Sequence, residues 1–434
     1  MLGLATGAIV APATAAVPTG PDGQPLDTIR LVSQNLRGKA GSGDQPSASD
    51  NARWVAYDSQ GESLVEGSVC PAGLNGPCAY LTDRRTKTTM LASPPVTGDQ
   101  LTYGVDDVTI SANGRVVVYA SFADNLAVDD DNGDWDVFAF DRTTGAVELL
   151  SRNPAGEPAN GDSFDPDVSR DGRYVVYHSS ARDLVPGDPN GPVKDVFLLD
   201  REAGTTSVIN LSLDGGRSAL ESTAASISDD GQFVTFQSES SDLVEGDDNA
   251  SGDVFVHEVA TGQTELLSRT AGGDPGNGDS FGAMISGDGS AVAFGSAASD
   301  LVAGDANGDS DVFVADRASG AVTLVSRTPA GVPGDWFSLT AQPSRDGSLI
   351  TFVSAAADLV EQETHSYVDV YVFERATGDV TWVSHTPDGL PPNGQSWRPT
   401  ISGDGSFVMF ASIANNLARD GSRRHYNVYA YRVS

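Results

Sequence analysis

The chain has 434 residues and a formal net charge of −34, from 60 acidic and 26 basic side chains. This surplus excludes the basic surface that nucleic-acid binding needs, and it disfavours docking to anionic membranes. The acids are 47 Asp and only 13 Glu, which suits turns and cation-binding loops better than helices.

The first 27 residues are apolar, rich in small residues and almost uncharged, and Thr14-Ala15-Ala16 offers small side chains suited to signal cleavage. We interpret residues 1–27 as a signal peptide or leader, although the usual basic start is missing and a disordered tail is the alternative. We therefore expect a secreted protein or one of the periplasm or cell envelope. No later segment is long and apolar enough for membrane insertion.

The chain contains two cysteines, Cys70 and Cys78. An exported protein would oxidise such a close pair, so we predict a disulfide between them. Two thiols alone would not complete a zinc site, which needs four ligands.

A Ser-x-Asp-Gly-like turn followed by an alternating apolar run recurs along the whole chain. Successive turns are 62, 58, 59, 58, 58 and 58 residues apart, and their serines are Ser49, Ser111, Ser169, Ser228, Ser286, Ser344 and Ser402. A fixed period of this length indicates a repeat architecture with one supersecondary unit per repeat.

The third repeat displays the unit most clearly. Residues 165–169 predict a first strand, residues 173–179 a second, residues 195–200 a third and residues 205–211 a fourth. Seven such units without a helical segment predict an all-β fold, a seven-bladed β-propeller with four antiparallel strands per blade. The chain ends on a third strand at residues 427–431, so residues 28–33 are expected to supply the missing fourth strand. One domain then spans residues 28–434.

The loop between the second and third strands carries oxygen side chains at alternate positions in four repeats. Side chains of this kind near a Gly are suited to wrapping Ca²⁺. Loops that contain Asp, Asn and Gly merely as turn formers are the alternative. The predicted calcium ligands are Asp130, Asn132, Asp134 and Asp136; Asp188, Asn190 and Asp195; Asp247, Asn249, Ser251 and Asp253; and Asp305, Asn307, Asp309 and Asp311.

In the first repeat, Cys78 occupies the position of the last Asp of these loops. A disulfide would therefore clamp the loop that calcium is expected to clamp elsewhere, and would contribute roughly 2–3 kcal/mol.

The loops that lead into each first strand emerge on the same face as the calcium-type loops. Phe164 and Phe281 recur at one repeat position there, so we expect them to pack between blades. Non-repeating residues are better candidates for ligand contacts, and we predict that Trp336, Trp397 and Arg398 bind the ligand.

Carboxylates on the first strands should lie near the axis of the ring. Asp106 and Asp107 occur in one repeat, and Asp165 and Asp167 occur in the next. Paired carboxylates can perform acid–base chemistry on a glycosidic bond. The five histidines fall at different repeat positions, and no Ser-His-Asp order or two-His metal spacing emerges.

The repeats SRDGRYVVY, SDDGQFVTF, SGDGSAVAF and SRDGSLITF, each followed by Asp-Val-Phe or Asp-Val-Tyr, resemble the repeats of TolB-like periplasmic β-propellers. This WD-like resemblance covers all seven units and implies the fold, but it implies little about function.

We therefore predict an exported, monomeric, calcium-binding propeller. Its predicted role is that of a non-catalytic scaffold that binds a protein or glycan on the loop-rich face. The alternative is a glycan-active hydrolase or lyase that uses the axial Asp residues.

Overall fold

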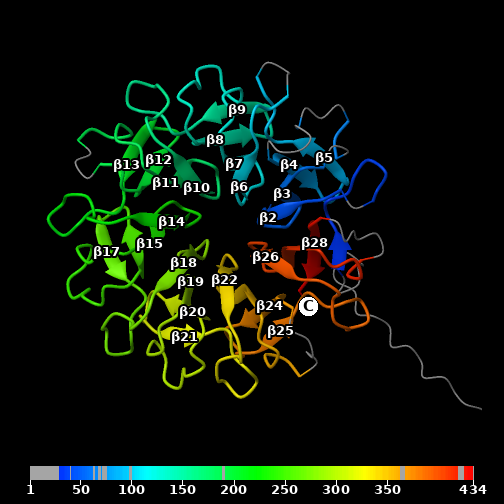
Figure 1. Ribbon diagram of the computed structural model, residues 1–434, viewed down its shortest axis with the longest axis vertical. Helices are drawn as coiled ribbons and strands as arrows, with labels where there is room; N and C mark the ends of the chain where they lie inside the picture. Colours follow the sequence, from blue (N-terminus) through cyan, green and yellow to red (C-terminus); the bar gives the residue numbers. More distant parts are fainter. Residues whose placement is uncertain are drawn as a thin grey trace, which may run out of the picture.

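The computed structural model describes residues 29–39, 41–61, 64–66, 70, 76–96, 100–187, 191–361, 367–418 and 425–433. These residues form seven antiparallel sheets of four strands each, arranged as blades around a central axis (Figure 1). The predicted all-β, seven-bladed propeller is confirmed. No helix in this part of the chain is long and apolar enough to cross a membrane.

The blades follow one another in chain order. Blades one to three contain β2 (Asp44–Ala48), β3 (Trp54–Ser59), β4 (Cys78–Asp83), β5 (Thr88–Leu91); β6 (Val105–Ile110), β7 (Val116–Ser121), β8 (Asp136–Asp141), β9 (Ala146–Leu149); β10 (Ser163–Val168), β11 (Tyr174–Ser179), β12 (Asp195–Asp200) and β13 (Thr205–Val208). Blades four and five contain β14 (Ser222–Ile227), β15 (Phe233–Ser238), β16 (Asp253–Glu258), β17 (Gln263–Leu266); β18 (Ser280–Ile285), β19 (Ala291–Ser296), β20 (Asp311–Asp316) and β21 (Val322–Leu324). Blades six and seven contain β22 (Ser338–Pro343), β23 (Leu349–Ser354), β24 (Asp369–Glu374), β25 (Val380–Trp382); β26 (Ser396–Ile401), β27 (Phe407–Ser412), β28 (Asn427–Arg432) and β1 (Ile29–Leu31).

The ring closes through the two ends of the described chain. β1 pairs antiparallel with β28, with Ile29 opposite Tyr431 and Leu31 opposite Tyr429. Next to this ladder, the Val428 amide donates a hydrogen bond to Ser33 Oγ at 3.0 Å. The expected completion of the last blade by the N-terminal strand is therefore confirmed.

The Ser-x-Asp-Gly motif builds the turn between the first and second strands. In blade three, Ser169 Oγ donates to Asp171 Oδ1 at 3.0 Å and accepts from the Tyr174 amide at 2.9 Å. Gly172 has a φ of +83°, and a Cβ there would meet Val116 of the preceding blade. This Gly is therefore required both by the turn and by the contact between blades.

The core of every blade contains a stacked aromatic pair that joins its second and third strands. The ring centroids are 5.5 to 6.2 Å apart. The pairs are Tyr57–Tyr80, Tyr119–Phe138, Tyr177–Phe197, Phe236–Phe255, Phe294–Phe313, Phe352–Tyr371 and Phe410–Tyr429. Because the third strands are buried almost along their whole length, they read as continuous apolar runs.

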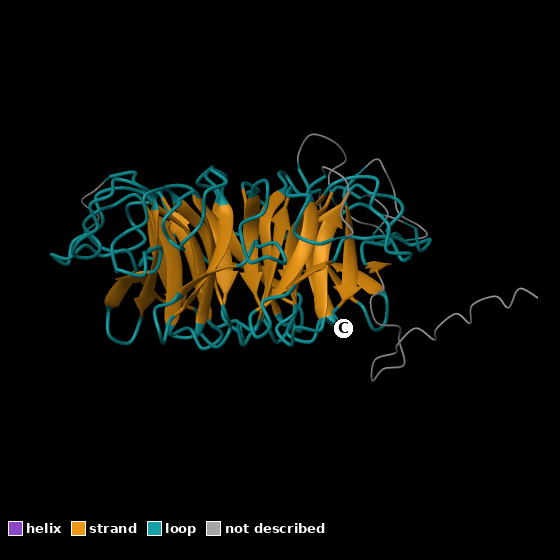
Figure 2. Ribbon diagram, turned by 90° about the horizontal axis from the view of Figure 1, so that it is seen from below, coloured by secondary structure: helices purple, strands orange, loops and turns teal. Residues whose placement is uncertain are grey.

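The two faces of the ring differ. The long connections between second and third strands, and those between blades, gather on one face, and short turns cover the other (Figure 2). We call the axial opening on the long-loop face the mouth, and the opposite end of the axis the far end. The mouth lies at the start of each first strand, and the far end lies at the Ser-x-Asp-Gly turns.

Candidate functional site at the mouth of the ring

Every first strand carries a β-bulge close to the mouth, where the register with the second strand shifts. The bulge residue has a positive φ in all seven blades. These residues are Gln45, Asp107, Asp165, Ala224, Gly282, Thr340 and Arg398. Only one of them is glycine, so six residues with side chains adopt a backbone conformation that ordinarily costs free energy. Bulges re-aim side chains, and here they form a ring of variable side chains around the mouth.

Two of these bulge residues form a carboxyl pair. The Asp165 amide donates to Asp107 Oδ2 at 3.3 Å. Burial of the Asp107 carboxyl, together with the charges of Asp165 and Asp106, raises its pKa to about 8. The pair can therefore hold a proton near neutral pH.

Neighbouring polar groups fix the position of Asp107. Its amide donates to Gln45 Oε1 at 2.8 Å, and Gln45 Nε2 donates to Asp106 Oδ1 at 2.6 Å. Gln45 thus connects the first strand of blade one to that of blade two and holds the carboxyl pair from one side.

His178 supports the pair from the other side. It lies on β11 opposite Phe164, and its Nδ1 is 3.4 Å from Asp165 Oδ2 without a hydrogen bond. The His178 side chain is 6% exposed and that of Asp165 is 46% exposed, so the carboxylate rather than the imidazole meets the solvent. Burial lowers the pKa of His178 and favours its neutral form.

The adjoining blade one is also acidic at the mouth. Burial and the charge of Asp44 raise the pKa of Asp58 to about 7, and Arg398 acts against this rise. Arg398 Nε lies 3.8 Å from Asp44 Oδ1. The mouth therefore gathers five carboxyl groups and one guanidinium group, from Asp44, Asp58, Asp106, Asp107, Asp165 and Arg398.

A chain of aromatic rings runs from the carboxyl pair into the loop between β7 and β8 of blade two and the connection before β6. Phe164 lies 5.9 Å from His178 and 5.3 Å from Trp135, measured between ring centroids. Trp135 continues to Tyr103 at 6.0 Å, and Tyr103 meets Phe122 at 5.2 Å. Tyr103 and Phe122 are exposed, and Trp135 and Phe164 are half-buried. We call Tyr103, Phe122, Trp135 and Phe164 the aromatic path.

Asp167 has a different environment from the carboxyl pair. It lies deeper in the axial channel, where its Oδ2 accepts from the Ile227 amide at 3.0 Å and from Ser226 Oγ at 2.9 Å. Its Oδ1 accepts from the Val168 amide at 2.8 Å. Of the predicted axial acids, the structure therefore brings Asp107 and Asp165 together, with Asp106 beside them, and gives Asp167 a role in joining blades.

The far end of the channel is closed by ion pairs between second residues of the Ser-x-Asp-Gly turns. Arg170 lies 2.5 Å from Asp50 and 3.3 Å from Asp229, and Arg345 lies 2.5 Å from Asp229. A Cβ at Gly403 would meet Asp50, so this turn needs glycine to leave room for the network. The cavity between these turns and the bulges measures about 110 Å³.

The calcium-type loops of blades two, four and five share a hydrogen-bond arrangement. Asn132 Nδ2 donates to Asp136 Oδ2 and to the Ala159 carbonyl, both at 2.8 Å, and Ser151 Oγ donates to Asp136 Oδ1. Asn132 Oδ1 accepts from the Asp134 amide at 3.0 Å. The same contacts recur around Asn249 and Asp253, with Ser251 supplying the amide, and around Asn307 and Asp311, with Asp309 supplying it.

The first Asp of these loops has different surroundings. Asp130 and Asp247 are buried, and neither makes a hydrogen bond or ion pair within the described residues. Burial raises the pKa of each to about 6, and that of Asp305 rises for the same reason. No group of three or more His, Cys, Asp or Glu side chains in the described ranges is arranged to hold a metal ion. Calcium binding stays a prediction.

The remaining blades close the same loop by other means. In blade three, Asp195 accepts from Asn210 Nδ2 at 2.6 Å and pairs with Arg217 at 2.7 Å, whereas Asp188 and Asn190 lie outside the described residues. In blade one, Cys70 and Cys78 form a disulfide, as predicted.

The three predicted ligand residues are spread over the mouth face. Arg398 is at a bulge and belongs to the mouth site. Trp397 is half-buried, and its Nε1 donates to Gln395 Oε1 at 3.0 Å. Trp336 is 52% exposed and meets only Phe337 edge to face among the aromatic rings of the described residues.

Sequence reasoning missed His178 and Trp135. Both interrupt the repeat, since Trp135 occupies a position that is Lys194 or Gly252 in the next two blades, and this lack of repetition was the available signal. Phe164 was expected only to pack between blades, but it also continues the aromatic path.

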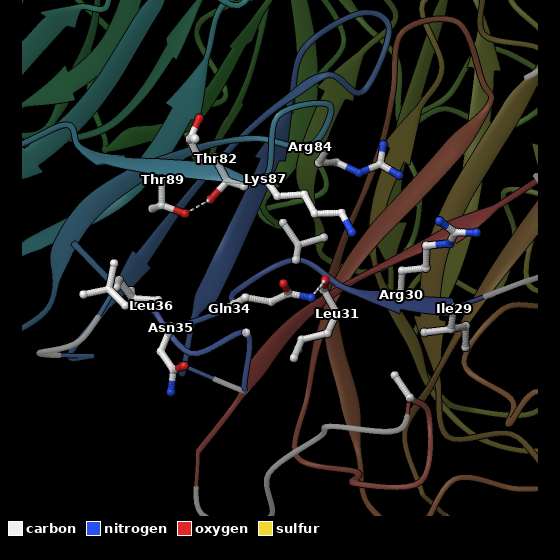
Figure 3. Close-up of a pocket in the computed structure, with 15 residues that line it drawn as sticks. Ile29, Arg30, Leu31, Gln34, Asn35, Leu36, Thr82, Arg84, Lys87 and Thr89 are labelled. Carbon is white, nitrogen blue, oxygen red and sulfur yellow. Dashed lines mark hydrogen bonds between the residues drawn. The ribbon is translucent and has the colours of Figure 1, made fainter. Parts of the chain in front are cut away.

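A larger cavity lies at the outer seam between blades seven and one (Figure 3). It measures about 610 Å³ and is lined by β1 and by the turn between β4 and β5, with Arg30, Arg84 and Lys87 directed toward it. Arg84 donates to the Ala52 carbonyl at 2.7 Å and covers the Phe407 ring, so it stabilises the seam. This cavity is remote from the carboxyl pair and the aromatic path.

Known structures share this fold. An oligogalacturonate lyase from Vibrio parahaemolyticus superposes with a TM-score of 0.56 at 13% identity, over 94% of this chain and 96% of its own. An oligogalacturonate lyase in complex with manganese gives 0.55 at 14% identity, over 94% and 97%. TolB from Acinetobacter baumannii gives 0.41 at 15% identity, over 83% and 78%. No protein-family model and no curated protein matches the chain. The propeller fold that the resemblance implied is thus confirmed.

Proposed function

We propose that this chain is an exported glycan-binding propeller that holds its ligand at the mouth without catalysing a reaction. The observation that carries this proposal is the aromatic path that runs directly up to the carboxyl pair of Asp107 and Asp165. Aromatic rings offer flat apolar surfaces to the faces of sugars, and carboxylates accept hydrogen bonds from sugar hydroxyls. The disulfide is compatible with export.

Binding of a panel of soluble oligosaccharides, measured by calorimetry, tests this proposal. Trp135→Ala should weaken the binding of any oligosaccharide that is recognised by roughly tenfold, because it removes the centre of the aromatic path. Leu390→Ala is the matched control, since it removes an exposed apolar side chain from a loop of another blade. If no oligosaccharide binds while a protein partner does, the ligand is a protein and the proposal is wrong.

A glycan-active enzyme is the second candidate, because Asp107 can hold a proton near neutral pH beside Asp165 and two propellers of similar fold are oligogalacturonate lyases. Cleavage of a bound oligosaccharide that is lost in Asp107→Asn would establish the enzyme and overturn the non-catalytic role.

We also propose that the loops of blades two, four and five bind Ca²⁺, with the first and last Asp of each loop as carboxylate ligands. Two observations support this. Asp130 and Asp247 are buried carboxylates without a hydrogen bond among the described residues. Each also lies near enough to the last Asp of its loop, Asp136 or Asp253, for the two negative charges to repel each other. Asn132 and its counterparts would orient the last Asp, since they direct their NH₂ groups to it. Metal analysis of the dialysed protein, and its melting temperature with and without a chelator, test this proposal.

A further inference from the structure

The charge at the mouth is unbalanced in a way that points to a class of ligand. Asp44 has Arg398 at 3.8 Å, and Asp165 has only the imidazole of His178 at 3.4 Å. Lys194, which also faces His178, pairs with Glu221 at 3.9 Å and adds no net charge. Asp58, Asp106 and Asp107 therefore have no cation of the described chain beside them at ion-pair distance.

Two buried polar atoms at the mouth also make no hydrogen bond. One is His178 Nδ1, in a residue that is 4% exposed, and it is directed at Asp165. The other is Asp58 Oδ1, on β3 of the adjoining blade one. Buried polar atoms normally find partners, so these two atoms and the carboxyl groups beside them are suited to a donor that comes from outside the chain.

We infer that the mouth binds a ligand that carries primary ammonium groups, and that this ligand is an oligosaccharide of non-acetylated amino sugars. The inference rests on the proposed glycan function and specifies its substrate class. An ammonium group has three donors and can be shared by two carboxylates such as Asp107 and Asp165. The neighbouring rings of Phe164 and Trp135 supply both a surface for the sugar and a favourable field for the cation.

The same features disfavour other ligands. A sugar acid would place its carboxylate among five acidic side chains and would be repelled, which separates this mouth from the substrate named for the oligogalacturonate lyases. An acetylated amino sugar would satisfy the aromatic path but would leave the carboxyl pair without a cation. The acidic mouth and the aromatic path together therefore select for charge as well as for shape.

Calorimetric titration with tetramers of glucosamine, N-acetylglucosamine and galacturonic acid tests the inference. The glucosamine tetramer should bind about tenfold or more tighter than the acetylated tetramer, because it adds charge-assisted hydrogen bonds, and galacturonate should not bind. Binding should weaken as salt is added. It should also release protons, which comparison of buffers with different ionisation enthalpies detects, since an ammonium beside Asp107 favours its ionised form.

Variants separate the possible outcomes. Asp107→Asn with Asp165→Asn should abolish the preference for glucosamine while leaving weak binding through the aromatic path. The control, Glu374→Gln with Asp379→Asn, removes two exposed charges from a turn at the far face and should keep the preference. If the acetylated or the acidic tetramer binds as tightly as glucosamine, the inference is wrong and the glycan function stands. If none of the three tetramers and no other oligosaccharide binds, both are wrong.

Discussion

The two ends of the axial channel use carboxylates in opposite ways. At the far end, Asp50 and Asp229 are held by Arg170 and Arg345, so each acid has a basic partner at 2.5 Å. At the mouth, five carboxyl groups share a single guanidinium group, and the pKa of Asp107 rises to about 8. The two ends belong to the same seven first strands and differ only in which residues occupy them.

This difference separates structural acids from functional ones. The far-end network neutralises itself and closes the channel, so its loss should affect folding alone. The mouth retains acids without a basic partner in the described chain, two of them on strained bulges, and in our proposal a ligand completes this arrangement. The loops of blades two, four and five are intermediate, because Asn and Ser donors satisfy their last Asp.

The largest expected effect is the loss of ligand binding when the carboxyl pair is neutralised. Asp107→Asn with Asp165→Asn should weaken binding of the glucosamine tetramer roughly 10- to 100-fold, because charge-assisted hydrogen bonds are lost. The folded state should be kept, since these carboxyl groups carry no structural ion pair with an arginine or lysine of the described chain. Equal affinity in calorimetry for the variant and the parent protein would place the ligand elsewhere.

A smaller effect is expected in the loops above the mouth. Asn132→Ala removes the donor to Asp136 Oδ2 and to the Ala159 carbonyl, and should destabilise the protein by about 1–3 kcal/mol in urea unfolding. Added Ca²⁺ should raise the melting temperature of the parent protein, and a chelator should lower it. No bound metal and no change with chelator would leave hydrogen bonds as the means of closing these loops.

Substitutions at the far end should have a still weaker effect, and only on the stability of the protein. Arg345→Ala removes a half-exposed partner of Asp229, so the free energy of unfolding should fall by about 1 kcal/mol or less. Its affinity for the glucosamine tetramer should equal that of the parent protein. A marked loss of affinity would show that the two ends are coupled and that their separation is wrong.

A separate effect concerns the pH dependence of stability. The pKa of Asp107 is about 8 in the folded state and about 4 when unfolded, so the folded state retains this proton longer. The contribution of this carboxyl group to the free energy of unfolding is fully present below about pH 4, and it is lost as the pH rises toward 8. Asn does not ionise, so Asp107→Asn should gain stability relative to the parent protein between pH 5 and pH 8. The urea midpoints of the variant and the parent protein at pH 5 and pH 8 test this. A difference between the two proteins that is the same at both pH values would contradict it.

The fold could be predicted from the sequence because the repeat carries it. Ser169, Asp171 and Gly172 build a turn that recurs in every blade, and the disulfide followed from the close spacing of Cys70 and Cys78 in a chain expected to be exported. The bulges could not be foreseen, because their residues share no type. The sequence placed Asp107 and Asp165 near the axis but did not predict that they contact each other. The burial of His178 beside Asp165 depends on contacts between strands that no single segment encodes.

The most direct test of the mouth site is a crystal structure of the protein with the glucosamine tetramer bound. We predict that the sugar lies along Trp135 and Phe164, with an amino group within hydrogen-bonding distance of Asp107 or Asp165. A tetramer found in the seam cavity beside Arg30 and Lys87, or elsewhere away from the mouth, would contradict the central claim.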